Sequence, residues 1–397
     1  MVPATLSSKA TLAARAFTAA CGLLWLGTAA ASEVRLHVDG PVETVFRWKQ
    51  DGCPSDFIPD SPARAFRRPD GSVMLIAAHF RNGSFAGPSL DRLKPRCHAS
   101  SGGAELDQPE RFDDRFWVQG LAPLPKGGLF ALVSHEYMGK RHPGRCLSAS
   151  RPGPQCWYSA IVGATADAQG LSFSLEPPAT RVVAAPPTRF DPGATARTGF
   201  FTATNIVEAG GWLYFVSWAE IPGTRGNCLF RAPSDSPAGP WRARRAGGFT
   251  GFFPSAYETG RDEHTTPTRC DVIGADRQLG ILRSIVRLET VDLYVGVFSV
   301  ANGMQRPAGI YYSLSPDLLT WGEARMLVDL RPWYGTMECA AFYDYPSLID
   351  PASSSPTFAT AGQHLQLYLT RFNWSTCDRG LDRDLVRLSI AVRTGAP

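Results

Sequence analysis

The stretch GLFALVSHEY, residues 128–137, is an apolar run that follows a glycine turn and ends in the polar group His135-Glu136-Tyr137. Apolar runs of this length, bounded by turn residues, are typical of buried strands. Similar runs follow turns elsewhere: SVMLIAAHF (72–80), WLYFVSWAE (212–220), QHLQLYLTRFN (363–373) and a less regular copy that includes LGILRSIVRL (279–288) or LYVGVFSV (293–300). The chain therefore contains five similar units.

A second strand-like segment precedes each run, so each unit is expected to begin with a hairpin. These preceding segments are residues 59–66, 116–118, 202–207, 270–273 and 345–349. Further hairpins are indicated in three units by IVGATADAQGLSF (161–173), CLFRAPSDSPAGPWRA (228–243) and GIYYSLSPDLLTWGEARML (309–327). The pattern predicts an all-β protein, a five-bladed β-propeller. A two-sheet sandwich is the alternative, and it explains five similar hairpins less naturally.

The N-terminal residues have the layout of a secretory signal. Lys9 and Arg15 precede an apolar segment, residues 16–26, and small residues follow it. We therefore expect a signal peptide over residues 1–31 and one domain over residues 32–397, exported to the periplasm or secreted. No other apolar run is long enough to span a membrane, so no membrane contact is expected after signal removal. The net charge of +4 and the lack of a dense basic run argue against a nucleic-acid partner.

Eight cysteines follow the expected signal. An even number of cysteines in an exported protein predicts disulfide bonds. In the predicted propeller all eight fall on one face, where they would staple long loops, and such loops commonly carry binding sites. The expected pairs are Cys53–Cys97, Cys146–Cys156, Cys228–Cys270 and Cys339–Cys377.

Several short motifs add a resemblance to this pattern. They are SPDLLTW (315–321) with the preceding GIYYSL, and YPSLIDP (345–351), LYLTRFN (367–373) and LDRDLVRLSI (381–390). The chain resembles five-bladed propeller glycosidases, the glycoside hydrolase family 43 and arabinanase-like superfamily. The resemblance implies a funnel-shaped site that hydrolyses an arabinofuranosyl or xylosyl linkage in a polysaccharide or oligosaccharide, with inversion. Such a reaction needs one carboxylate as base and one carboxylic acid.

The resemblance also suggests which carboxylates act. Asp60, in the sequence PDSP, matches the position of the family's base. Glu136 is the expected acid, because apolar packing and a neighbouring histidine can raise its pKa. The family's third, tuning aspartate is replaced by Asn205, which cannot carry a charge. Other residues that remain open for the role of acid are Glu338, Asp350 and Asp271.

Further residues are expected to position the substrate at the same rim. They are His79, His135, Asn205, Tyr345, Arg371 and Trp374, and the loop aromatics Trp157, Trp333 and Tyr334 offer additional rings for stacking on sugars. Arg383 is expected to bind a sugar or to form an ion pair. No cofactor is required, although a structural calcium ion could bind in the central channel. The alternative functions are a non-catalytic carbohydrate-binding propeller and a polysaccharide lyase that uses a histidine and a tyrosine.

Overall fold

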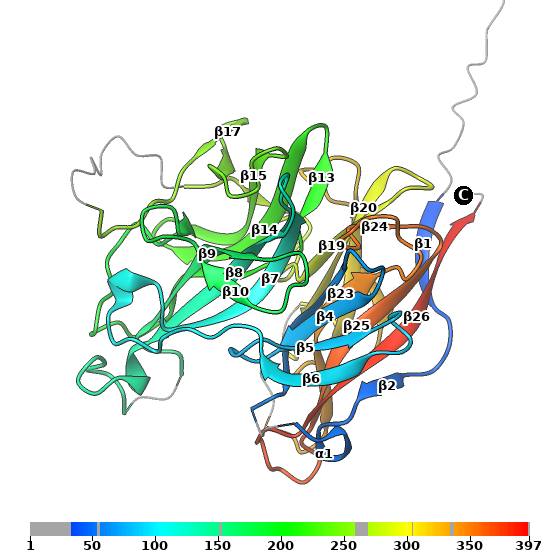
Figure 1. Ribbon diagram of the computed structural model, residues 1–397, viewed down its shortest axis with the longest axis horizontal. Coiled ribbons are helices and arrows are strands. Elements are labelled where there is room, and N and C mark those ends of the chain that lie inside the picture. Colours follow the sequence, from blue (N-terminus) through cyan, green and yellow to red (C-terminus); the bar gives the residue numbers. More distant parts are fainter. Residues whose placement is uncertain are drawn as a thin grey trace, which may run out of the picture. The chain divides into compact units, whose positions relative to one another are not determined.

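Antiparallel hairpins dominate the computed structural model of this chain (Figure 1). The structure describes residues 33–53, 56–150, 153–258, 269–303, 305–333 and 337–395, without the side chain of Ala78. The expected signal peptide lies outside these residues. Within them, no helix is long and apolar enough to cross a membrane. Most of the described residues belong to one compact body over Arg35–Arg393.

The first hairpin unit is a simple meander. Its strands, in hydrogen-bonded order, are β3 (Pro59–Arg67), β4 (Val73–Ala78), β5 (Gly83–Gly87) and β6 (Lys94–Ala99). The helix α1 (Trp48–Asp51) precedes this unit and the 3₁₀ turn η1 (Pro109–Arg111) follows it in the chain. The first expected hairpin, residues 59–66 with 72–80, is therefore present.

The second and third units share one large sheet. The second contains β7 (Arg115–Pro123), β8 (Leu129–Met138), β9 (Trp157–Ala166), β10 (Phe173–Leu175) and β11 (Val182–Ala184), with the 3₁₀ turn η2 (Gly139–Arg141) after β8. The third contains β12 (Thr198–Ala203), β13 (Val207–Ala209), β14 (Trp212–Ile221), β15 (Thr224–Pro233), β16 (Arg242–Arg245) and β17 (Gly248–Gly251). A short parallel pairing of β12 with β9 joins the two units.

The fourth and fifth units complete the strand order. The fourth contains β19 (Ser284–Leu288), β20 (Leu293–Val300), β21 (Gly309–Ser315) and β22 (Arg325–Val328), and β24 (Thr360–Ala361) pairs with β19. The fifth contains β23 (Ala341–Ile349), β25 (His364–Asn373), β26 (Arg383–Gly395) and β1 (Glu33–Val38), and β2 (Glu43–Phe46) pairs with β26.

The start of the fourth unit differs from the expectation. Residues 270–273 were expected to form its first strand, but β18 (Val272–Ile273) pairs with β15 of the third unit. The first strand is instead β19, in which every residue except Arg287 is buried. The disulfide from Cys270 to Cys228 in β15 explains the difference, because it ties the segment before β18 to the third unit.

Arg64 lies where the first strands of the units meet. Its guanidinium donates to the backbone oxygens of Gln119 in β7, Ala203 in β12 and Arg283 beside β19, and to the hydroxyl of Ser347 in β23. Because Arg64 itself is in β3, one side chain joins the first strands of all five units. The units thus surround a common centre, which is the arrangement of a β-propeller.

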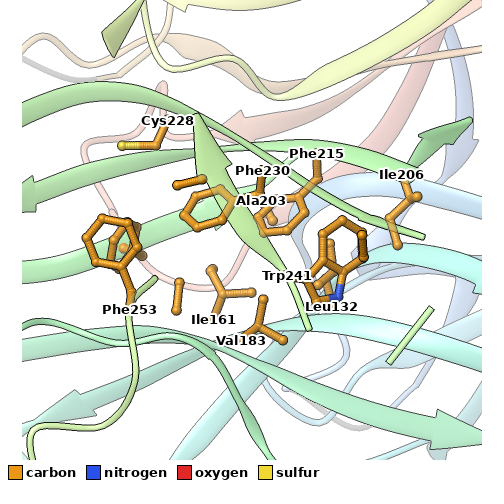
Figure 2. Packing of buried hydrophobic residues seen from close by; sticks show 14 of the residues in the cluster. Leu132, Ile161, Val183, Ala203, Ile206, Phe215, Cys228, Phe230, Trp241 and Phe253 are labelled. Carbon is orange, nitrogen blue, oxygen red and sulfur yellow. The ribbon is translucent and has the colours of Figure 1, made fainter. Parts of the chain in front are cut away.

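A buried apolar cluster fills the space between the second and third units (Figure 2). Leu132 and Ile161 from the second unit pack in the same cluster as Phe215, Phe230 and Trp241 from the third. The rings of Phe215 and Phe230 stack with their centroids 4.8 Å apart. Each fully buried side chain of this size contributes about 1.5–3 kcal/mol to folding, so this contact fixes the strands that carry the site.

Four disulfide bonds are present, and they join the expected pairs. They are Cys53–Cys97, Cys146–Cys156, Cys228–Cys270 and Cys339–Cys377. Four disulfides in one chain are typical of proteins from an oxidising, extracytoplasmic compartment.

Candidate active site

A cavity of about 230 Å³ contains side chains from all five units. Asp60 comes from β3, Glu136 from β8, Thr202 from β12 and Tyr345 from β23, while Arg283 directly precedes β19. These residues are far apart in the sequence, and the convergence of the first strands brings them together. Asp60 and Glu136 therefore line one cavity, as the two-carboxylate interpretation requires.

Asp60 is held by three side chains. His79 Nδ1 lies 2.6 Å from its Oδ2, while Arg383 Nη1 and, at 3.4 Å, the hydroxyl of Tyr345 contact its Oδ1. Burial raises the pKa of this carboxyl, but the charge of Arg383 and the contacts with His79 outweigh it and leave the pKa below its usual value. Asp60 is therefore ionised at neutral pH.

Glu136 has a contrasting environment. Alternation along β8 directs Ser134, Glu136 and Met138 into the cavity, whereas His135 and Tyr137 are fully buried on the other side. Among the described residues, no hydrogen bond or ion pair within 4 Å reaches its carboxyl group. Burial raises the pKa of Glu136 to about 8, although the charge of Arg115 opposes this. Glu136 is therefore mostly protonated at pH 7.

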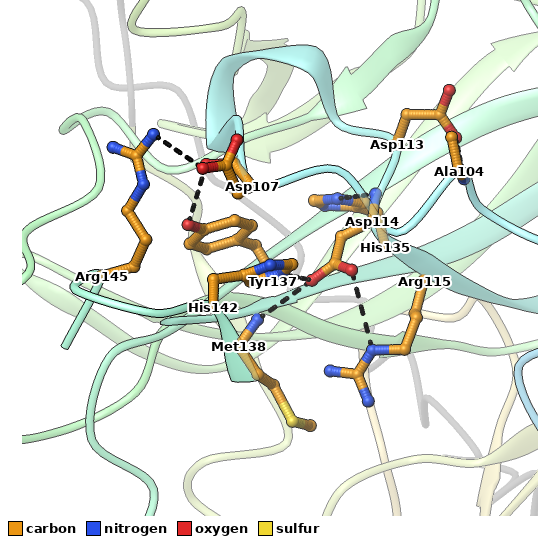
Figure 3. Close-up of polar contacts among 10 residues, drawn as sticks. All are labelled: Ala104, Asp107, Asp113, Asp114, Arg115, His135, Tyr137, Met138, His142 and Arg145. Atoms are coloured by element: carbon orange, nitrogen blue, oxygen red, sulfur yellow. Dashed lines mark hydrogen bonds and ion pairs between the residues drawn. The ribbon is translucent and has the colours of Figure 1, made fainter. Parts of the chain in front are cut away.

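A buried polar group centred on Asp114 lies at the end of β8 (Figure 3). Asp114 accepts from the backbone N–H of Met138 at 3.4 Å and contacts His142 Nε2 at 3.0 Å. Its Oδ1 is 3.9 Å from Nε of Arg115, which is paired with Glu136 in the register of β7 and β8. Asp114 therefore helps to hold the end of β8 and the arginine beside Glu136.

A larger cavity, of about 670 Å³, adjoins the first and shares Arg197, Ile281 and Arg283 with it. Trp218 and Glu220 of β14 line this second cavity. Glu220 accepts two hydrogen bonds from Arg197 at 2.6 and 3.0 Å and one from the indole of Trp218 at 2.8 Å. The larger volume is in the range of ordinary ligand sites, about 300–1,000 Å³.

His135 and Asn205 do not line either cavity, contrary to the expectation that they bind substrate. The His135 ring is fully buried, and its Nε2 accepts from the backbone N–H of Asp114 at 3.2 Å. Burial and the charge of Arg115 lower the pKa of His135 to about 3, so the ring is neutral. The amide of Asn205 is used by the backbone of Ile285 and the hydroxyl of Ser284, which links β12 to β19.

Arg371 and Trp374 also lie outside the two cavities. Arg371 pairs with the buried Asp384 at 2.5 Å. Trp374 is only 4% exposed and packs against Phe342 and Phe372, so its ring is not available as a sugar platform. Both side chains therefore stabilise the fifth unit. Arg371 does so through its ion pair with Asp384, and Trp374 through its packing in the apolar cluster.

The alternative acids are placed elsewhere as well. Glu338 is exposed and pairs with Arg331 at 3.1 Å, and Asp350 accepts from the backbone N–H groups of Ala352 and Gly362. Asp271 is exposed at the edge of the third unit. None of the three lines the cavity that contains Asp60. Of the loop aromatics, Trp157 lines this cavity, Trp333 packs near Trp374, and Tyr334 lies outside the described residues.

The centre between the first strands does not fit a calcium ion. Carbonyl oxygens there would be suitable ligands, but the guanidinium of Arg64 already binds those of Gln119, Ala203 and Arg283. A divalent cation would be repelled by this fixed positive charge. The described residues also contain no cluster of three or more His, Cys, Asp or Glu side chains suited to a metal.

The cavity is also lined by residues that the sequence patterns do not identify as part of a site. Arg115, Trp117 and Gln119 alternate along β7 and all line it. Their spacing of two is the signal that could have identified them, because alternate residues of a strand share a face. Arg197 and Arg283 lie in segments just before strands, and no repeat marks them.

Comparison with known proteins gives distant structural likenesses. No protein-family model matches the sequence, and no curated protein matches it. The α-L-arabinanase of Cellvibrio cellulosa in complex with arabinohexaose is 12% identical with a TM-score of 0.46, over 84% of this chain and 92% of that chain. A glycosyl hydrolase from Bacteroides ovatus is 9% identical with a TM-score of 0.46, over 91% and 94%. At this distance they assign neither a family nor an activity to this chain.

Proposed function

We propose that this protein is a glycoside hydrolase in which Asp60 acts as the base and Glu136 as the general acid. The observation that carries the proposal is that the two carboxyl groups line one cavity, where ion pairing lowers the pKa of Asp60 and burial raises that of Glu136. Pairs of carboxyl groups whose environments push their pKa values apart are the usual acid and base of glycoside hydrolysis.

The contacts of each residue suit its proposed role. Asp60 is ionised and has three side-chain partners, and a carboxylate has about four acceptor positions. One position is left to orient and activate a water molecule. Glu136 has no such partners among the described residues, so its proton is available to the leaving oxygen of the scissile linkage.

The substrate we propose is an arabinofuranosyl or xylosyl linkage in an oligosaccharide or polysaccharide, cleaved with inversion. The smaller cavity suits one sugar residue, and the adjoining cavity of about 670 Å³ suits the rest of the chain. The half-buried ring of Trp157 at the smaller cavity offers apolar surface for the sugar.

The test is the release of reducing sugar from a panel of arabinans, xylans and arabinoxylans by the mature protein. Turnover that is abolished in both Asp60→Asn and Glu136→Gln supports the proposal, and proton NMR of the first-formed anomer reports inversion. Binding without turnover would instead favour a carbohydrate-binding protein. An unsaturated product that absorbs in the ultraviolet would favour a lyase.

A further inference from the structure

Arg115 is a buried cation with unused hydrogen-bonding capacity. Its side chain is 5% exposed, and among the described residues its Nε and Nη2 atoms have no hydrogen-bond partner. The distance of 3.9 Å between Nε and Asp114 Oδ1 is too long for a hydrogen bond. Unpaired buried donors on a charged group are costly, so a missing acceptor is expected beside Arg115.

The position of Arg115 indicates where that acceptor binds. Arg115 lines the same cavity as Asp60 and Glu136. Asp60 already contacts Arg383, which lies on the last strand, and Glu136 is mostly neutral at pH 7. Neither of these two carboxyl groups therefore neutralises Arg115. The buried Asp114 is the nearest carboxylate and offsets part of its charge from 3.9 Å, without a hydrogen bond, so a ligand in the cavity can still supply the acceptor.

The surrounding charge is also positive. Five arginines and three carboxyl groups line the two adjoining cavities: Arg115, Arg197, Arg225, Arg283 and Arg306, with Asp60, Glu136 and Glu220. Glu220 is paired with Arg197 at 2.6 Å. An excess of fixed positive charge inside a cleft attracts an anionic ligand and raises its local concentration.

We propose that Arg115 forms a binding subsite for the carboxylate of a uronic acid residue, so that the substrate is an acidic glycan. This inference rests on the proposed function, since it names the class of glycan that the same site would cleave. A pentose linkage in a glycan that carries uronate side groups satisfies both proposals. The flat guanidinium fork matches a carboxylate through two parallel hydrogen bonds, which a neutral sugar hydroxyl cannot make.

The carboxylate can be tested without knowing the full substrate. Sodium D-glucuronate and D-glucuronamide have nearly the same shape and differ in charge, and their affinities for the mature protein can be compared through tryptophan fluorescence. We expect glucuronate to bind about tenfold or more tightly, since hydrogen bonds to charged groups contribute about 1.5–3 kcal/mol. D-glucose 6-sulfate is the third probe, and a preference for it over glucuronate would overturn the carboxylate assignment.

Variants assign the effect to Arg115. Arg115→Met is expected to abolish the preference for glucuronate, and Arg115→Lys to retain part of it. The matched control is Arg287→Met, because Arg287 is 41% exposed, pairs with Asp292 and lines neither cavity. Thermal melting of each variant shows whether it folds. If Arg115→Met does not fold, Arg115→Lys takes its place, and an undiminished preference for glucuronate in that variant would overturn the assignment to Arg115.

The outcome is separable from that of the hydrolase test. Glu136→Gln should lose turnover and keep the preference for glucuronate. A preference for glucuronate in a protein that hydrolyses nothing would support the subsite and contradict the hydrolase proposal. Hydrolysis of neutral glycans with equal binding of glucuronate and glucuronamide would overturn the subsite alone.

Discussion

Arg383 and Asp60 are 323 residues apart in the sequence and form an ion pair within the proposed site. Arg383 is the first residue of β26, and Asp60 is the second residue of β3. Their side chains are only 15% and 14% exposed. The contact therefore joins the last strand to the first hairpin unit and at the same time keeps the proposed base ionised.

Removal of this arginine should weaken activity most at acidic pH. Without Arg383, burial raises the pKa of Asp60 and one of the main opposing effects is lost, so the base becomes protonated at a higher pH. In Arg383→Met we expect the acidic limb of the kcat/KM profile to move to higher pH. At a pH below this limb, kcat/KM of Arg383→Met should be lower than that of the unaltered protein by about tenfold for each pH unit of the shift. Arg383→Lys keeps the charge and should restore part of the profile. An unchanged limb in the methionine variant would show that Asp60 is not the base.

Glu136 should set the alkaline limit of activity. Its pKa of about 8 means that the proton needed for the leaving group is lost above that pH. We expect kcat/KM to fall about tenfold for each pH unit above about 8, and kinetics from pH 4 to 10 would measure it. A limb that persists in a Glu136→Asp variant at the same pH and amplitude would contradict the assignment.

The same group should make the folded protein less stable as pH rises. Glu136 has a raised folded pKa, so its contribution to stability is complete below the unfolded value of 4.5 and is lost as pH rises to about 8. Glu136→Gln should therefore increase the free energy of unfolding at pH 8, on the order of 2 kcal/mol after solvent screening. Urea unfolding at pH 4 and pH 8 tests this, and an equal effect at the two values would contradict it.

Arg64 should be essential to the fold. Its replacement by methionine would leave the carbonyls of Gln119, Ala203 and Arg283 without their donor in a buried place. We expect Arg64→Met to lower the free energy of unfolding by about 3–5 kcal/mol, measured by urea denaturation. The exposed Arg287→Met serves as its control and should cost less than about 1 kcal/mol. A loss of less than about 1 kcal/mol in Arg64→Met would mean that the first strands meet without its help.

The sequence predicts most of the strands, because runs of apolar residues that become buried recur in each unit. The hairpin runs around residues 72–80, 128–137, 212–220 and 363–373 are apolar where β4, β8, β14 and β25 cross the core. The four expected disulfide pairs are present, although the expected position of all eight cysteines on one face does not by itself choose among their possible pairings. The first strand of the fourth unit was misplaced, because the sequence does not show that β18 pairs backward with β15.

The side-chain environments in the site were harder to predict. Adjacent residues of a strand point to opposite faces, so His135 and Glu136 could not both reach the cavity. The pattern did not reveal which of them would. Arg371 and Trp374 lie at the strand end where substrate-binding residues are expected. However, Arg371 pairs with Asp384 and the ring of Trp374 packs against Phe372. Such partners come from distant strands, which local sequence does not identify.

His135 should make the protein sensitive to acid. Burial and the charges of Arg115 and Arg181 lower its pKa to about 3, so the folded state holds the neutral ring while the unfolded state takes up a proton below about pH 6.5. The contribution of the neutral ring to the free energy of unfolding is complete above about pH 6.5. It is lost as the pH falls toward 3, by at most ~1.4 kcal/mol per pH unit. His135→Gln keeps an acceptor for the backbone N–H of Asp114 and cannot titrate in this range, so its unfolding free energy should fall less steeply between about pH 6.5 and 4. The exposed His98→Gln provides the control, and equal slopes in the unaltered protein and His135→Gln would show that His135 is not buried in its neutral form.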